Sequence, residues 1–277
     1  MEKAELERQV AEAVDAARRE VPLVGSVTNA VSVNFVANAQ LAAGGSAAMV
    51  YLPDEAEFLA QAGGALYLNL GTLLPVHEET MPRAARAMRE LGKPWVLDPV
   101  GIGIGSLRTG ILKELKACRP AVVRANASEV IALAGLWELD GGDVRAQVRG
   151  VDSTDEVGAA EGAAVALARW TGGAVAVSGA VDLVTDGDVV ATSRGGSPLM
   201  EKVTGFGCSL GGVAAVYAAV ASPLAAALAA TAAYNLAGAR AFARVQAPGS
   251  FQTAFLDELY EASAADVAGN PFEIREV

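Results

Sequence analysis

Short apolar runs alternate along the chain with longer alanine-rich segments, and this alternation predicts its secondary structure. The runs at 65–70, 94–97, 121–124 and 174–177 are bounded by Gly or Pro and have the length of strands buried on both faces. A polar segment to about Arg19 predicts an N-terminal helix, and residues 30–43 predict a second helix before a strand near 47–52. Because strands and helices alternate, the pattern indicates an α/β fold built on parallel strands.

The pattern changes in two places. Residues 183–185 and 189–192 flank Asp186-Gly187-Asp188, a turn sequence that predicts a β-hairpin. Residues 203–239 contain no Lys, Arg, Asp, Glu or His, and the stretch exceeds the ~20 residues that a membrane-spanning helix needs. Ser222-Pro223 interrupts it, and its apolar character comes from alanine, so we expect two buried helices in a hairpin and no membrane span.

Composition narrows the class of protein further. Hydrophobic residues make up 52% of the 277 positions and charged residues 19%, which supplies a large core and excludes intrinsic disorder. The net charge of −11 repels a phosphate backbone, so nucleic-acid binding is not expected. No repeat, linker or composition break divides the sequence, which predicts a single domain over 1–277. Two widely separated cysteines and a charged N-terminus without an apolar signal segment predict a cytoplasmic protein.

Polar side chains recur where the predicted strands end. Asn69, Asp98, Arg124, Asn126 and Ser178 each stand at or just after a strand. In open α/β sheets ligands bind outside the carboxyl ends of the strands, so these residues are candidates for one shared site. Each of them could instead cap a helix or a turn, and it is their repeated placement that favours a site.

The segment Gly205-Phe206-Gly207-Cys208 leads directly into an alanine-rich helix. Glycines at a helix N-terminus leave backbone N–H groups open to an anion, and the helix dipole attracts negative charge there. The segment lacks the lysine of a Walker loop and the third glycine of a dinucleotide fingerprint, so close packing of small residues is an alternative. A thiol in the first helical turn should have a lowered pKa, whereas a buried inert cysteine is its alternative.

Asp98 and Glu129, with the amide of Asn126, suit Mg²⁺ that is held partly through water. Arg108 and Arg124 are candidates for nucleotide phosphate. Helix capping and ordinary ion pairs are the alternatives for these four charged residues.

Two other matches are discounted. Cys118 and Arg124 have the spacing of cysteine phosphatases, but the residues between them form a strand pattern without the glycines of a phosphate loop. His77 is the only histidine and stands beside Glu78 at a predicted helix start, where we expect an exposed residue rather than a catalytic base.

These residues together resemble the hydroxyethylthiazole kinases of the ribokinase-like superfamily, and the resemblance spans nearly the whole chain. Its glycine loop, Val203 to Cys208, has cysteine where other ribokinase-like enzymes carry a general-base aspartate. The other segments that carry the resemblance are Thr28-Asn29 with Asn34, Ala37 and Asn38, Gly44 to Met49, Asp98 to Gly103, Pro120 to Glu129, Asp182 to Gly187, and Pro198 to Met200. Phe206, Ser197, Gly45 and Ala47 depart from the family pattern, which has threonine, histidine, alanine and proline there.

The resemblance implies a ribokinase-like three-layer α/β/α fold with a mostly parallel central sheet. It also implies phosphorylation of the hydroxyl of 4-methyl-5-(2-hydroxyethyl)thiazole by ATP with Mg²⁺, a step of thiamine biosynthesis or salvage, in a homotrimer with sites at subunit interfaces. By position, Cys208 would be catalytic. The binding residues would be Asn29, Asn38, Met49 and Gly205 for the substrate, Arg124, Ser178 and Gly207 for ATP, and Asp98 and Glu129 for the metal.

Other functions remain open at this point. A ribokinase-like kinase for another small alcohol, an ATP-dependent dehydratase of similar fold and a non-catalytic nucleotide sensor would share much of this pattern.

Overall fold

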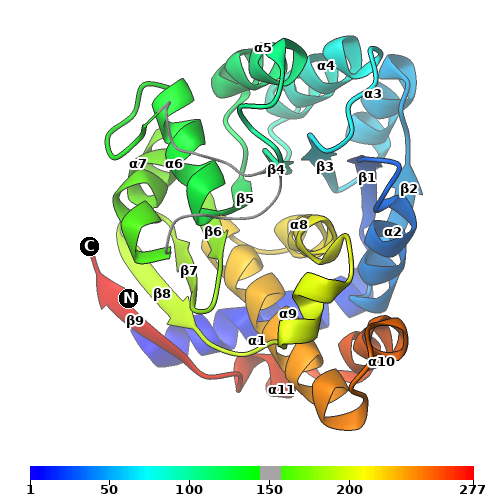
Figure 1. The fold of residues 1–277 in the computed structure, drawn as a ribbon, viewed down its shortest axis with the longest axis vertical. Coiled ribbons are helices and arrows are strands. Elements are labelled where there is room, and N and C mark those ends of the chain that lie inside the picture. The colour runs from blue at the N-terminus through cyan, green and yellow to red at the C-terminus, as the bar shows by residue number, and fades with distance from the viewer. Residues whose placement is uncertain (144–156) are drawn as a thin grey trace.

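The computed structural model describes residues 1–143 and 157–277, and its central feature is a nine-stranded sheet (Figure 1). The strands are β1 (Leu23–Val27), β2 (Ser46–Met49), β3 (Ala65–Asn69), β4 (Trp95–Asp98), β5 (Val122–Asn126), β6 (Ala174–Ser178), β7 (Asp182–Thr185), β8 (Val189–Ser193) and β9 (Phe272–Glu276). Their order in the sheet is β2-β1-β3-β4-β5-β6-β7-β8-β9. The pairs from β2 to β6 are parallel, and those from β6 to β9 are antiparallel.

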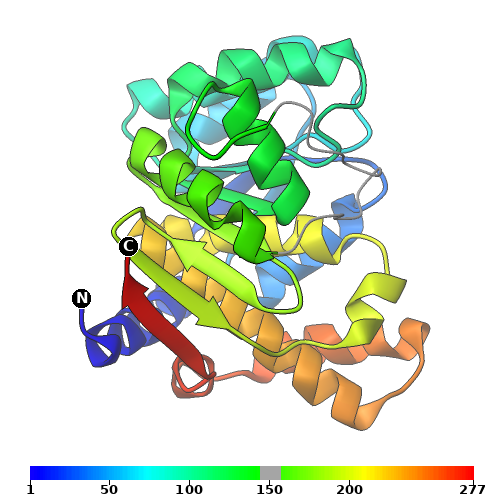
Figure 2. The ribbon, with the colours of Figure 1, turned by 60° about the vertical axis from the view of Figure 1, so that its left-hand side comes forward.

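Helices cover both faces of this sheet (Figure 2). One face carries α1 (Lys3–Glu20), α2 (Val33–Ala42), α8 (Phe206–Ala218), α9 (Pro223–Arg244), α10 (Pro248–Glu261) and α11 (Ala264–Ala268). The other carries α3 (Pro53–Ala62), α4 (His77–Glu90), α5 (Ser106–Leu115), α6 (Ala127–Leu136) and α7 (Glu161–Thr171). Short 3₁₀ turns lie at η1 (Lys116–Cys118), η2 (Val157–Ala160) and η3 (Pro198–Lys202).

The strand sequences explain the three layers. Successive strand residues point to opposite faces, and in this sheet both sets are apolar. In β4, for example, Val96 packs into the α8 and α9 side, while Trp95 and Leu97 pack into the α4 and α5 side. The expected three-layer α/β/α arrangement with a mostly parallel sheet is therefore confirmed.

Most of the predicted elements are present. The four apolar runs form β3, β4, β5 and β6, and the Asp186-Gly187-Asp188 hairpin joins β7 and β8. Residues 203–239 form α8 and most of α9, two packed helices that Ser222-Pro223 separates. Over the described residues, no helix combines the length and apolar character needed to cross a bilayer.

Two strands, β1 and β9, are not predicted from the sequence. β1 contains Gly25 and Ser26, which interrupt the apolar run, yet it lies inside the sheet between β2 and β3. Gly25 is required there, because a Cβ at this position would overlap the side chains of Leu66 and Leu59. β9 is an edge strand with charged residues, and only its pairing with β8 makes it a strand.

Candidate active site

The carboxyl ends of the parallel strands bring the polar residues into one cluster. Asn69 lies beside Asp98 in the pairing of β3 with β4, and Asn126 lies beside Ser178 in the pairing of β5 with β6. The shared rim that the sequence predicts is therefore present. Tyr67, which faces the same side of β3 as Asn69, joins it: its hydroxyl donates to Asp98 Oδ2 at 3.0 Å.

Cys208, the third residue of α8, lies beside this rim. Gly205 is the N-cap of α8 and has φ +94°, a left-handed conformation that glycine adopts without strain. The Nδ2 group of Asn29 donates to Cys208 Sγ at 3.6 Å and to Asn69 Oδ1 at 2.8 Å. The first helical turn thus holds the thiol against amides from the ends of β1 and β3.

The prediction of a lowered thiol pKa is wrong. Burial raises the pKa of the Cys208 thiol, and the Asp98 carboxylate raises it further. Ser32, Arg124 and Asn69 lower that pKa, but they do not outweigh the loss of water around the sulfur. The sequence shows the position in the first turn but not this burial.

Asp98 and Glu129 form the acidic side of the cluster. Asp98 Oδ1 accepts from the Val100 N–H at 3.2 Å, and Glu129 Oε1 accepts from the Gly101 N–H at 3.1 Å. Burial raises the pKa of both carboxyl groups, that of Glu129 to about 7, and the Asp98 charge contributes to the second shift.

Asp98 and Glu129 are both buried, and their negative charges repel each other when both are ionised. A divalent cation between them would offset this repulsion. Over residues 1–143 and 157–277, no group of three or more His, Cys, Asp or Glu side chains could hold a metal ion. Asp98 and Glu129 therefore fit Mg²⁺ whose remaining ligands are water and phosphate oxygens, rather than a full protein cage.

Arg124 supplies the basic side of the cluster from β5. Its Nη2 donates to Ser178 Oγ at 3.0 Å, and its Nη1 lies 3.6 Å from Asp98 Oδ2. Its buried Nε finds no hydrogen-bond partner within the described residues. Gly207 lies directly against the guanidinium, because a Cβ there would overlap Nη1. A partly unpaired arginine beside a bare helix N-terminus fits a polyphosphate.

Asn38 and Met49 are not part of this cluster in the described chain. Asn38 lies on the exposed face of α2, where its amide donates to Asn34 Oδ1 at 3.1 Å. Met49 ends β2, the edge strand, and is half-buried. Arg108 lies nearer the rim, since its Nε donates to the Leu70 carbonyl and its guanidinium packs under Gly101.

Sequence reasoning misses Tyr67 and misplaces His77. The sequence could have predicted the position of Tyr67, because a strand residue two positions before Asn69 lies on the same face of the strand as Asn69.

His77 is fully buried rather than exposed: its Nδ1 accepts from the Leu74 N–H at 2.9 Å, and its ring lies 5.7 Å from that of Tyr51. Burial lowers the pKa of His77.

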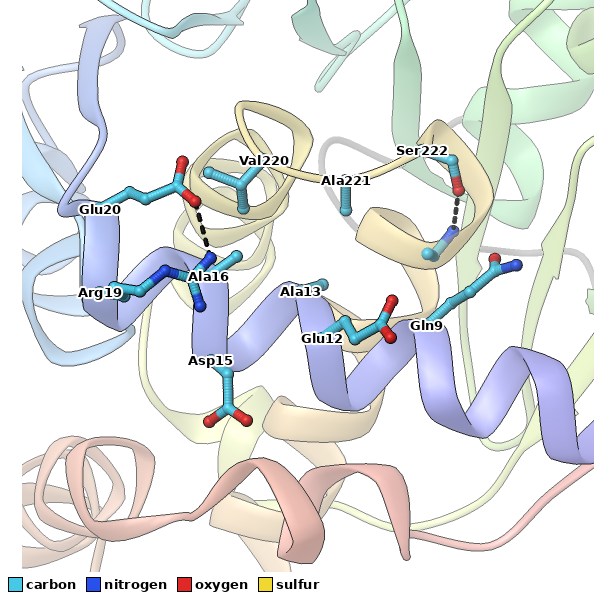
Figure 3. Close-up of a pocket in the computed structure, with 11 residues that line it drawn as sticks. Gln9, Glu12, Ala13, Asp15, Ala16, Arg19, Glu20, Val220, Ala221 and Ser222 are labelled. Atoms are coloured by element: carbon cyan, nitrogen blue, oxygen red, sulfur yellow. Dashed lines mark hydrogen bonds and ion pairs between the residues drawn. The ribbon is translucent and has the colours of Figure 1, made fainter.

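A separate groove of about 580 Å³ lies between α1 and the turn that joins α8 to α9 (Figure 3). Glu12 and Gln9 from α1 face Val220, Ala221 and Ser222 across it. The groove is at the end of α8 opposite Cys208, so it is not part of the candidate active site.

The fold and this cluster define a protein of the ribokinase-like class. A ribokinase-like superfamily protein from Enterococcus faecalis V583 matches with a TM-score of 0.61 at 12% identity, over 94% of this chain and 94% of that chain, which shows the shared fold. The hydroxyethylthiazole kinase protein of Pyrococcus horikoshii OT3 matches with a TM-score of 0.84 at 32% identity, over 98% and 99%.

Sequence comparison narrows the class to one family. The hydroxyethylthiazole kinase of Bifidobacterium longum (strain DJO10A) is 51% identical over 277 residues, which covers 94% of this chain and 88% of that protein. The sequence profile of the hydroxyethylthiazole kinase family matches residues 14–265. This chain therefore belongs to the hydroxyethylthiazole kinase family, and it is a kinase. The resemblance noted from its motifs is confirmed.

Proposed function

We propose that this protein transfers the γ-phosphoryl group of ATP to the hydroxyl of 4-methyl-5-(2-hydroxyethyl)thiazole, with Mg²⁺, as a step of thiamine biosynthesis or salvage. Family membership supports the reaction. The observation that carries it is the position of Cys208. The thiol lies at the N-terminus of α8, where it accepts from the Asn29 amide, and both the Asp98 carboxylate and the Arg124 guanidinium act on its pKa.

The nucleotide would bind along the basic side. Arg124 and Ser178 would hold phosphate oxygens, and the amides of Gly205, Gly207 and Cys208 would receive the transferred group. Asp98 and Glu129 would hold Mg²⁺ through water and phosphate, and the ion would neutralise phosphate charge in the loose transition state. Positioning and charge neutralisation would supply most of the rate enhancement, because such a transition state demands little of the nucleophile.

Cys208 would accept the proton of the substrate hydroxyl as the nucleophile attacks. A positioned base contributes about 10²–10⁴-fold to such a step. Because burial raises the pKa of the thiol, ionisation is the costly part of this role, and Ser32, Arg124 and Asn69 lower that cost. The Asn29 donor would stabilise the ionised sulfur as well. Removing the thiol should therefore slow turnover strongly without abolishing it.

Asn29 and Gly205 would contact the thiazole alcohol from the subunit that supplies Cys208. Asn38 and Met49 would come from a neighbouring subunit of a homotrimer. Their location on α2 and on the edge strand β2 supports this division. Apolar side chains around that edge are also exposed: Val31, Leu41, Leu52 and Phe58. An unpaired strand edge with exposed apolar residues is typical of a subunit interface.

We also propose that residues 1–277 form a single domain. The sheet supports this, because its opposite edges are β2 from the N-terminal part and β9 from the C-terminus, and α1 packs against α9 and α11.

The test is direct. Purified protein incubated with ATP, Mg²⁺ and the thiazole alcohol should give the phosphate monoester and equimolar ADP, detected by mass spectrometry. Cys208→Ala protein should give far less product in the same time. ADP formation with a different small alcohol, and none with the thiazole, would contradict the proposed substrate.

The metal assignment makes a second prediction. Because Asp98 and Glu129 supply only part of a coordination shell, the protein without nucleotide should bind Mg²⁺ weakly. Calorimetric titration of Mg²⁺ should show strong binding only after ADP is added. Tight binding to the protein alone would contradict the assignment and indicate a dedicated metal site.

A further inference from the structure

The side-chain amides of Asn69 and Asn29 are each held in one orientation by backbone N–H groups. Gly71 N–H donates to Asn69 Oδ1 at 3.0 Å. The N–H groups of Val31 and Ser32 donate to Asn29 Oδ1, both at 3.1 Å. Backbone N–H groups can only donate, so both amide oxygens must face them, and the position of each NH₂ group follows.

These orientations define a directed chain of hydrogen bonds. The Asn69 NH₂ group donates to the Tyr67 oxygen at 2.9 Å, which leaves the Tyr67 hydroxyl hydrogen for Asp98. At the other end, Asn69 Oδ1 accepts one hydrogen of the Asn29 NH₂ group. The second hydrogen of that group points to Cys208 Sγ. The sulfur is therefore held as a hydrogen-bond acceptor.

We propose that Asn69 is a positioning residue for the reaction, because its amide oxygen fixes the Asn29 NH₂ group against Cys208 Sγ. In the proposed function Asn69 touches neither substrate nor nucleotide. Its amide oxygen acts on the sulfur through Asn29, and its side chain also lowers the pKa of Cys208 directly. Asn29 and Asn69 are buried and Cys208 is half-buried. The inference rests on the proposed role of Cys208 as the base.

The surroundings of the thiol make this donor important. Asp98 is the facing anion and opposes ionisation, while Arg124 from β5 is the facing cation and favours it. Tyr67 and Tyr234 also lie near, and burial keeps the pKa of both hydroxyls well above their ordinary value. Beside the Arg124 charge, the interactions that stabilise the thiolate are hydrogen bonds to the sulfur from the side chains of Asn29, Ser32 and Asn69.

The test measures the thiol itself, so it needs neither thiazole nor ATP. In a Cys118→Ser background, Cys208 is the only thiol, and its alkylation by iodoacetamide across a pH series reports its pKa. Asn69→Leu keeps the side-chain size and removes the amide. The pH midpoint should rise by about one unit, which makes alkylation about tenfold slower at pH values below the midpoint.

Asn235→Leu is the matched control. Asn235 is also a buried asparagine, but its amide donates to Asp182 and Ser193, at the β7 and β8 end of the sheet. The control should keep the original midpoint even if it loses similar stability. An unchanged midpoint in Asn69→Leu, or an equal rise in Asn235→Leu, would overturn the proposal.

Two further measurements keep the test decisive if Asn69→Leu fails to fold. Asn69→Ala removes the same oxygen with less crowding and should show the same shift. In unaltered protein with ¹⁵N-labelled asparagine, the Asn29 side-chain amide resonance should move at the pH where Cys208 alkylation has its midpoint. An Asn29 amide that does not respond there would overturn the proposal. Failure of the thiazole assay alongside a positive alkylation result would contradict only the substrate.

Discussion

Glu129 is held by two backbone donors, yet its ionised form is unfavourable. Its carboxylate accepts from the N–H groups of Gly101 and Asn126, and with Asn126 it forms the capping box that begins α6. Burial still raises its pKa to about 7, and the nearby Asp98 charge adds to this. The carboxyl group of Glu129 therefore caps a helix. In the proposed function it would also lie near Mg²⁺, whose positive charge would favour the ionised carboxylate.

Glu129 should therefore make folding stability fall as pH rises. In the unfolded chain its pKa is near 4.5, and in the folded protein about 7. Between these values the folded state keeps a proton that the unfolded state has lost, so the free energy of unfolding declines with rising pH. The loss is complete above the folded pKa and is on the order of 3 kcal/mol.

Urea unfolding at pH 5 and pH 8 measures this decline. Glu129→Gln should show a smaller decline than the unaltered protein, because glutamine does not ionise. Glu90→Gln, which changes an exposed glutamate of α4, should keep the original decline. Equal declines in all three proteins would show that Glu129 ionises as freely in the fold as in the unfolded chain.

Cys208 makes a second prediction at the scale of one residue. Because the pKa of Cys208 is raised, kcat/KM should increase with pH in the alkaline range as the thiol ionises, and this alkaline limb of the pH profile should give the apparent pKa of the thiol. Cys208→Asp should stay active and lose that limb, since a carboxyl group ionises at lower pH. Cys208→Ser should be far slower. If Cys208→Ala and Cys208→Ser keep full turnover while the chemical step limits the rate, the base assignment is wrong.

At the scale of elements, the start of α8 is fixed from both sides. Phe206, where the family pattern has threonine, is buried and turns away from the site: its ring lies 4.9 Å from Phe35 and 4.7 Å from Phe255, between α2 and α10. Its neighbour Gly207 faces the opposite way, against Arg124. The aromatic contacts therefore anchor the turn that presents Gly207 and Cys208.

Gly207→Ala should disturb the nucleotide side of the site. The new methyl group would overlap the Arg124 guanidinium and displace it from Ser178 and Asp98. ADP binding, measured by calorimetry, should weaken by about tenfold or more as this charge-assisted contact is lost. Gly162→Ala on α7, where a methyl group meets nothing within 4 Å, should bind ADP normally. Equal affinity in both variants would remove Arg124 from the nucleotide site.

The sequence predicts elements best where local pattern and tertiary context agree. Trp95-Val96-Leu97 reads as a buried strand and is one, whereas Gly25 and Ser26 hide β1 because only its neighbours explain them. The rim residues follow from strand ends, since parallel strands must end together. The raised pKa of Cys208 could not be predicted, because it depends on burial by segments far apart in the chain.

At the scale of the whole molecule, the predicted substrate residues divide into two groups. Asn29 and Gly205 lie with Cys208, whereas Asn38 and Met49 lie on the outer side of the sheet edge. A site that needs both groups is incomplete in a single chain. A second copy of the chain would complete it by placing its β2 edge against the Cys208 cluster of the first. Closed rings of identical chains repeat such a contact at every interface.

Mixed trimers test this arrangement. In the proposed homotrimer, pure Met49→Trp trimers should be inactive because the substrate side is blocked. Pure Cys208→Ala trimers should be strongly impaired because they lack the base. After equal mixing by unfolding and refolding together, a site drawing Met49 and Cys208 from different chains is intact in about a quarter of cases, so about a quarter of the original activity should return. The measurement is turnover of trimers that carry both affinity tags. Only one of the three interfaces in such a trimer pairs an intact Met49 with an intact Cys208, so these selected trimers should show about a third of the original activity. If those verified mixed trimers remain inactive, Met49 and Cys208 of different chains do not share a site.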